Sequence, residues 1–277
     1  MGLGGGFGAI SIAAGSVTAP LIAAALAPLF GWRSIFVVTG VLGLLWIPLW
    51  GGVSARAPSI AAEEAAAAHA EARHLIRDIR LWSIAIAYCL VFTLYTLWAN
   101  WTTIYLVQER HLTQAQANAR YAWFPPAFAV LGGFFAGALA FYWIRGGVPA
   151  VVARMRTCWV TAPFLICGAA IPFLPGAGLA AAAIGASFLA FQSLLGTLFL
   201  LPLDLFGARR AGFTNSLLAF FAAGTQVLVS PAVGAIIDHV GFTALCLAVP
   251  LLPLSGLTLL QMSLRAAPAA LSASPAR

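Results

Sequence analysis

The stretch GLAAAAIGASFLAFQSLLGTLFLLP at residues 178–202 carries no charged side chain. A helix rises about 1.5 Å per residue, so about 20 apolar residues cross the hydrocarbon core of a bilayer. This stretch therefore predicts a transmembrane helix. Similar stretches fill the rest of the chain, and we place eight spans near 5–28, 34–53, 81–107, 121–143, 151–174, 178–202, 212–236 and 241–263.

The composition supports a membrane protein. Hydrophobic residues make up 62% of the 277 residues and charged residues only 8%, whereas a soluble fold of this size needs more polar surface. In lipid, each span must satisfy its own backbone hydrogen bonds, which favours helices. We predict an all-α polytopic membrane protein with eight transmembrane helices.

The fourteen basic residues, all arginine, are divided unequally between the two sides of this topology. Three lie on one side: Arg33, Arg110 and Arg120. Eleven lie on the other: Arg56, Arg73, Arg77, Arg80, Arg145, Arg154, Arg156, Arg209, Arg210, Arg265 and Arg277. The positive-inside rule places the richer side, and with it both termini, in the cytoplasm. Loops that face anionic lipid explain the net charge of +7, so we predict no nucleic-acid partner.

The longest polar segment, 54–80, divides the chain. It is rich in alanine, and its charges are spaced as on a helix. We interpret it as a cytoplasmic loop between two membrane bundles. Residues 1–53 then hold the last two helices of the first bundle, 81–265 hold a six-helix bundle, and 266–277 form a disordered tail.

Several motifs receive structural interpretations. The four cysteines lie inside spans and are expected to pack as small apolar residues, without disulfides, metal or cofactor. The glycine-rich stretch at 2–8 lacks the lysine of a phosphate loop. Gly133-x-x-x-Gly137 is expected to let two helices approach closely.

No carboxylate or histidine falls near the middle of a span, which argues against an enzyme. The neutral polar residues at mid-depth are therefore the candidate substrate-binding residues: Tyr88, Tyr95, Asn100, Gln192 and Gln226. Such groups can bind a polar solute in a water-filled cavity or bond to neighbouring helices. For the serines and threonines of the spans we favour the bonds within the protein. Trp98 and Trp101 fit either a cavity wall or an interfacial belt.

Seven segments together resemble the major facilitator superfamily, and within it the anion:cation symporter branch. They are GSVTAPLI (15–22), GWRSIFVVTGVLGLLWIPLW (31–50), YTLWANWTTIYLVQERHLTQAQA (95–117), AWFPPAFAVLGGFFAGAL (122–139), RGG (145–147), LPLDLFGARRAGFTNS (201–216) and SPAVGAIIDHVGF (230–242). The resemblance implies spans five to twelve of a twelve-span carrier, with the joint between its two bundles at 54–80.

The resemblance also implies a function. It implies symport of a small organic anion, such as a hexuronate, aldonate or tartrate, with protons, by alternating access in a bacterial-type cytoplasmic (inner) membrane. The partners are then the anion, protons and the lipid bilayer. In this branch the coupling acids and a substrate-binding arginine lie on spans one and four, which have no counterpart in this sequence. The alternative is a truncated or remnant membrane protein with no transport activity on its own.

Overall fold

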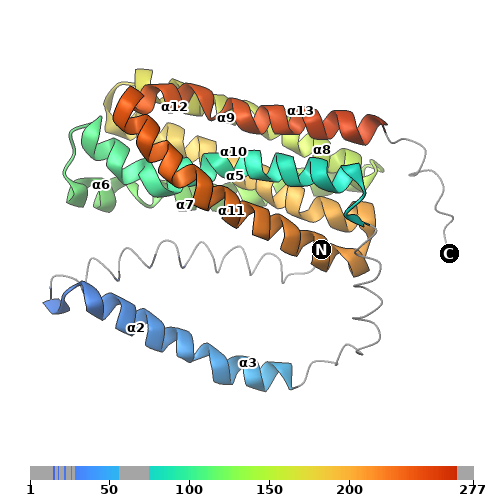
Figure 1. The fold of residues 1–277 in the computed structure, drawn as a ribbon, viewed down its shortest axis with the longest axis horizontal. Coiled ribbons are helices and arrows are strands. Elements are labelled where there is room, and N and C mark those ends of the chain that lie inside the picture. The colour runs from blue at the N-terminus through green and yellow to red at the C-terminus, as the bar shows by residue number, and fades with distance from the viewer. Residues whose placement is uncertain are drawn as a thin grey trace. The chain divides into compact units, whose positions relative to one another are not determined.

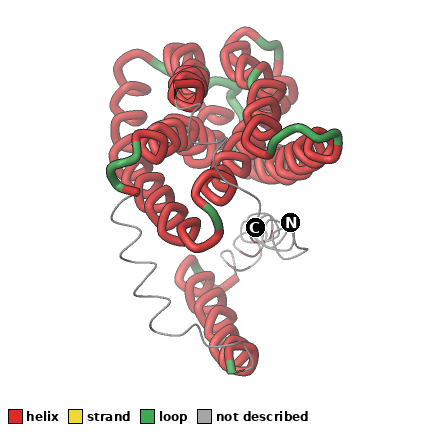
Figure 2. Tube along the Cα trace, turned by 90° about the vertical axis from the view of Figure 1, so that its right-hand side faces the viewer, coloured by secondary structure: helices red, strands yellow, loops and turns green. Residues whose placement is uncertain are grey.

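The computed structural model describes residues 29–55 and 75–266, together with Gly15, Thr18, Ile22 and Leu26. The chain divides into two compact units, Met1–Ala70 and Glu71–Arg277. The described residues form helices joined by short turns and include no strand (Figure 2). Most of the predicted first span, most of the 54–80 loop and nearly all of the tail lie outside the described residues.

The described residues of the first unit include one apolar span, Trp32–Val53, in two pieces. Helix α2 (Trp32–Leu44) ends at Leu45, and α3 (Trp46–Ser54) follows directly. Pro48 explains this break, because proline lacks the N–H that would bond to the Leu44 carbonyl. No residue of α2 is buried, so its apolar side chains can meet lipid or other helices on every side.

The second unit holds six spans (Figure 1). In chain order they are α5 (Ile79–Gln108); α6 (Gln114–Tyr121) with α7 (Phe124–Arg145); α8 (Ala150–Thr161) with α9 (Pro163–Ala170) and the 3-10 helix η1 (Ile171–Phe173); α10 (Gly176–Phe206); α11 (Ala208–Val240); and α12 (Phe242–Ala248) with α13 (Leu251–Ala266). With Trp32–Val53, the described residues hold seven membrane-length spans. These match seven of the eight predicted spans.

Prolines set the internal breaks of the spans. Pro125 and Pro126 begin α7 after the end of α6, and Pro163 begins α9 after the end of α8. Proline suits the first turn of a helix because its missing N–H has no partner there in any case. Pro202 and Pro231 instead lie inside α10 and α11.

Two glycines end the longest helices. Gly207, with φ of 83°, separates α10 from α11, and Gly241, with φ of 80°, separates α11 from α12. Glycine adopts this left-handed conformation without steric cost. The predicted spans 178–202 and 212–236 are therefore too short at this junction, since Gly207 alone separates α10 from α11.

Helices α5 and α10 form the centre of the six-span bundle (Figure 1). In the apolar 18-residue stretch of each helix, 67% of α5 and 61% of α10 is buried. The corresponding share is 17% in the spans that contain α7 and α11. Helices α11 and α13 pack on α5, while α7, α8 and α9 pack on α10. The polar groups of α5 and α10 are therefore the ones withdrawn most from lipid.

The close contact between α7 and α10 depends on a glycine other than those predicted. A Cβ atom at Gly132 would lie 2.2 Å from the Leu189 carbonyl oxygen. At Gly133 the nearest atom would be 3.7 Å away, and at Gly137 nothing lies within 4 Å. The prediction that Gly133 and Gly137 mediate close packing is therefore wrong by one residue. The buried face carries Gly132, Ala136 and Ala140, at intervals of four.

Asp78 caps the start of α5. Its carboxylate accepts a hydrogen bond of 2.9 Å from the backbone N–H of Arg80 and forms an ion pair of 2.7 Å with the Arg80 guanidinium. The hydrogen bonds from the Arg80 side chain hold the pKa of Asp78 below its usual value. The carboxylate therefore contributes stability above the ordinary aspartate pKa, and this contribution is lost as the pH falls through the lowered value.

We expect Asp78→Ala to lower the free energy of unfolding by about 1 kcal/mol at neutral pH. Asp78→Asn retains a capping side chain and loses the ion pair, which is partly exposed, so we expect a smaller loss. Thermal unfolding in detergent at pH 7 and pH 3 measures both effects. The difference between wild type and the alanine variant should shrink at pH 3, and an undiminished difference would contradict the role of the charge.

Candidate functional site

Five aromatic side chains gather where α5 meets α10, and we call them the aromatic cluster. Tyr88, Phe92 and Tyr95 come from α5, and Phe188 and Phe191 from α10. The Tyr95 ring stacks on Phe191 with centroids 5.1 Å apart and meets Phe92 at 5.0 Å. Positions 88, 92 and 95 recur at helical spacing on one face of α5. The cluster therefore brings both predicted tyrosines together.

The two tyrosines differ in accessibility. Tyr88 is only 6% exposed and stacks on Phe92 with centroids 6.2 Å apart. Tyr95 is half-buried, so its hydroxyl is the more available of the two to a solute. A half-buried tyrosine presents an apolar ring and a polar tip at one position.

The three predicted amide residues lie on three elements and do not form one group. Gln192, half-buried, follows Phe191 on α10, and its Cγ approaches the position of a Cβ at Gly133 on α7. Asn100 is exposed on α5, about 140° around the helix from Tyr95. Gln226 is half-buried on α11. Gln192 is thus the amide nearest to the aromatic cluster in sequence, and its side chain lies against α7.

Many hydroxyl groups of the spans bond to the backbone, as we expected, although Ser263 Oγ is buried without a hydrogen-bond partner among the described residues. Thr93, Thr96, Thr197 and Thr225 each donate to the carbonyl four residues earlier. The Ser193 hydroxyl lies 2.8 Å from the Gly132 carbonyl oxygen and donates a hydrogen bond from α10 to α7. These hydroxyl groups therefore already donate to acceptors within the protein.

Trp98 has neither of its two predicted roles. It is 1% exposed, and its ring meets Tyr105 edge-on with centroids 5.7 Å apart. It therefore belongs to the core of the bundle and not to a cavity wall or an interfacial belt.

Trp101 lies against Gly234 of α11, where an added Cβ would be 3.1 Å from the Trp101 ring. The indole N–H of Trp101 is buried with no hydrogen-bond partner among the described residues.

The sequence-based reasoning missed a buried ion pair between α8 and α10. Arg154 counts only as one of the eleven cytoplasmic-side arginines in the sequence analysis, but it lies on α8, which begins at Ala150, and it is only 7% exposed. Its Nε donates a hydrogen bond to the Asp204 carboxylate. Burial of Arg154 is possible because this carboxylate compensates its charge. Pro149 precedes the first turn of α8, in agreement with the predicted start of this span near 151.

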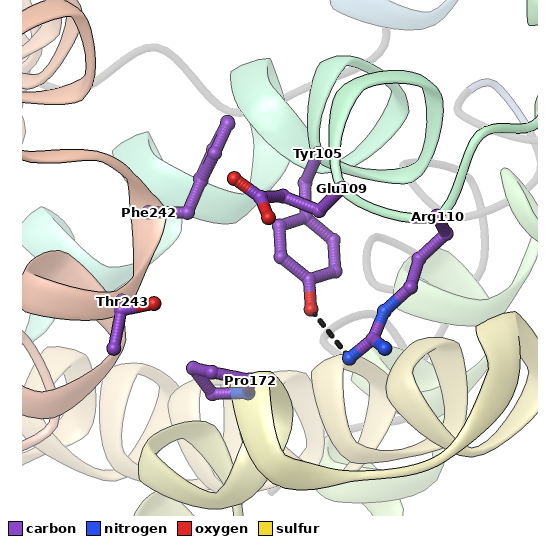
Figure 3. A pocket seen from close by; sticks show the side chains of 6 residues that line it. All are labelled: Tyr105, Glu109, Arg110, Pro172, Phe242 and Thr243. Carbon is purple, nitrogen blue, oxygen red and sulfur yellow. Dashed lines mark hydrogen bonds between the residues drawn. The ribbon is translucent and has the colours of Figure 1, made fainter.

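A cavity of about 240 Å³ lies at the opposite end of the bundle, where α5 ends (Figure 3). It is lined by Tyr105, Glu109, Arg110, Pro172, Phe242 and Thr243. None of these residues was among the predicted site residues, because they lie beyond the mid-depth positions that we considered. Among the described residues, no group of three His, Cys, Asp or Glu side chains is placed to hold a metal ion.

The family model described as Major Facilitator Superfamily matches residues 1–228, which is most of the chain. The chain belongs to the Major Facilitator Superfamily. Two curated proteins are similar to it, the hexuronate transporters of Escherichia coli strain K12 and of Escherichia coli O157:H7. Each is 23% identical over 278 aligned residues, which cover 92% of this chain. The chain spans 63% of the length of these relatives.

Membership of the Major Facilitator Superfamily confirms the resemblance that the sequence motifs indicate. The similarity to hexuronate transporters agrees with the anion:cation symporter branch. The family points to a transporter and away from an enzyme. The described spans agree with a multi-pass membrane protein in contact with lipid.

Proposed function

We propose that this chain forms part of a secondary active transporter that carries small sugar-acid anions with protons across a bacterial cytoplasmic membrane. The observation that carries this proposal is the superfamily match over residues 1–228, combined with the similarity to the two hexuronate transporters. Both termini would lie in the cytoplasm, as the arginine distribution predicts. A membrane protein with no transport activity of its own is the alternative.

The geometry of α5 and α10 supports this function. Aromatic faces pack well against the C–H groups of a sugar ring, and the Tyr95 hydroxyl can exchange hydrogen bonds with its hydroxyl groups. Gln192, next to Phe191 on α10, supplies an amide that donates to a carboxylate. Tyr88, Asn100 and Gln226 complete the proposed substrate-binding residues. Alternating access would then proceed by rocking of two bundles around a site at mid-depth.

Uptake into proteoliposomes tests the proposal. The purified chain is reconstituted, and uptake of radiolabelled glucuronate is followed with an inward-directed proton gradient, with and without a protonophore. We expect uptake that saturates and that the protonophore abolishes. Uptake that is indifferent to the protonophore would remove proton coupling. No uptake of glucuronate, galactonate or tartrate would favour the alternative.

We expect Gln192→Ala to lower glucuronate uptake at least about tenfold, because loss of a hydrogen bond to a charged group costs about 1.5–3 kcal/mol. The amount of protein in the membrane should be unchanged. Gln114→Ala is the matched control, since Gln114 is exposed at the start of α6. Initial rates at several glucuronate concentrations measure the effect. Equal kinetics in the Gln192 variant and the control would exclude Gln192 from the site.

A further inference from the structure

Two exposed arginines of the six-helix bundle lack an acidic partner. Arg156 lies on α8, and Arg265 lies in the last turn of α13. The ion pairs among the described residues involve neither of them, so each guanidinium has no carboxylate within 4.0 Å in this part of the chain. The sequences of α8 and α13 contain no acidic residue. Both helices therefore carry positive charge that the described residues leave uncompensated.

The fold brings these two helices together. The spans that contain α8 and α13 are the third and the sixth of the bundle, so they run in opposite directions. The start of α8 and the end of α13 accordingly lie on one side of the bundle (Figure 1). The indole N–H of Trp159 on α8 donates a hydrogen bond of 3.1 Å to the Oε1 of Gln261 on α13. This bond places the two helices side by side.

Both arginines lie about one helical turn from this hydrogen bond. Arg156 is three residues before Trp159, and these two residues share a face of α8. Arg265 is four residues after Gln261, and these two share a face of α13. The displacements along the helix axes are about 4.5 Å and 6 Å. Because the helices are antiparallel, both displacements point to the same end of the bundle, and the two guanidinium groups flank one position.

Exposed apolar side chains surround this position. Val152 and Val160, four residues to either side of Arg156, are 43% and 44% exposed, and Met262, three residues before Arg265, is 70% exposed. Exposed apolar side chains of a membrane span meet lipid. A charge in hydrocarbon is costly, so an arginine near the end of a span extends its guanidinium to the layer of headgroups. Both arginines therefore lie at the border between acyl chains and headgroups.

The hydrogen-bonded pair adds further polar groups at this border. The indole of Trp159 can only donate, so it engages the oxygen of the Gln261 amide. The Gln261 nitrogen keeps two N–H donors that no described residue accepts. The Trp159 ring is 38% exposed, and tryptophan favours the level of the headgroups in a membrane. The position therefore offers two cations, an amide donor and an interfacial aromatic ring.

We propose that the position between Arg156 and Arg265 binds the headgroup phosphate of an anionic phospholipid. Both guanidinium groups and the Gln261 amide donate to the phosphate oxygens. The Trp159 ring lies against the glycerol ester region, and an acyl chain runs along Val160. The arginine distribution predicts that this is the cytoplasmic leaflet. The site requires only a bundle that spans a membrane, and it does not depend on the proposed transport.

Native mass spectrometry of the purified full chain in detergent tests the site. Phosphatidylglycerol is titrated, and the dissociation constant of the first bound lipid is measured. We expect Arg156→Gln and Arg265→Gln each to raise this constant at least about tenfold, because each removes hydrogen bonds to a charged group. Arg209→Gln is the matched control, since Arg209 is exposed near the start of α11 and loses the same charge. It should bind the lipid as wild type does.

The double variant distinguishes one shared phosphate from two separate contacts. If both arginines bind one phosphate, Arg156→Gln with Arg265→Gln should weaken binding by less than the product of the two single factors. Factors that multiply in the double variant would overturn a shared site. Phosphatidylglycerol should also raise the melting temperature of wild type more than that of the double variant. Without lipid the two proteins should melt alike, because both arginines are exposed.

Two further ligands identify the occupant. Phosphatidylcholine, whose own cation compensates the phosphate, should bind wild type more weakly than phosphatidylglycerol does. Glycerol phosphate, which has no acyl chains, should not displace phosphatidylglycerol at an equal concentration. Displacement by glycerol phosphate would make a free phosphate the ligand and would overturn the lipid. Phosphatidylglycerol binding that is unchanged in both single variants would overturn the site.

Discussion

Gly132→Ala is expected to destabilise the six-helix bundle by about 3 kcal/mol, the upper end of the usual cost of overpacking. The added Cβ would lie 2.2 Å from the Leu189 carbonyl oxygen and 2.9 Å from the Leu189 Cα. Both atoms are backbone, so no change of rotamer relieves the overlap and α7 must move away from α10. That movement also lengthens the hydrogen bond from Ser193 to the Gly132 carbonyl.

Gly137→Ala provides the matched control for this prediction. The substitution and the helix are the same, but nothing lies within 4 Å of a Cβ at Gly137. Since alanine favours a helix over glycine by about 1 kcal/mol, this variant should be as stable as wild type or slightly more so. Melting temperatures and size-exclusion profiles in one detergent compare the two. Equal melting temperatures would show that α7 and α10 separate at little cost.

Arg154→Met is expected to cost about 3 kcal/mol or more, because it leaves the Asp204 carboxylate in a largely buried site without its partner. The side chains of Arg154 and Asp204 are 8% and 16% exposed, so water screens the remaining charge poorly. Asp204→Leu should cost a similar amount, since it leaves the guanidinium unpaired. The pair joins α8 to α10, and either single change should loosen that contact.

The double variant distinguishes a lost ion pair from lost packing. Apolar side chains of similar size can replace a buried pair at little cost, so Arg154→Met with Asp204→Leu should lie within about 1 kcal/mol of wild type. Arg156→Met serves as the control, because Arg156 is exposed on the same helix and should change little. If the stability losses of the two single variants simply add in the double variant, the two charges are not coupled.

Much of the fold could be predicted from local composition. Length and hydropathy predict a span without knowledge of its neighbours, and seven of the eight predicted spans are present in the described residues. Pro125 and Pro163 begin helical segments in the structure, as proline chemistry predicts. The motifs at 31–50, 95–117 and 201–216 indicated the superfamily that the family model then matched.

The candidate site was predicted less completely. A spacing of seven residues predicts that Tyr88 and Tyr95 share one face of a helix, and the structure places both in the aromatic cluster. The partners Phe188 and Phe191 could not be predicted, because they come from another span about 95 residues later. Arg110 was counted only as one charge in the topology. Its buried Nε and its bond to Ile171 depend on the approach of η1 to the end of α5.

The sequence alone determined that this chain crosses a membrane as helices and belongs among facilitator carriers, because hydropathy and short motifs are local properties. Tertiary structure decided which face of each helix is buried. A membrane helix is apolar all round, so its sequence carries little of the amphipathic signal that marks the buried face of a soluble helix. Three findings therefore required the packed bundle. Gly132, not Gly133, makes the close contact with α10, Trp98 lies in the core, and Asp204 pairs with Arg154.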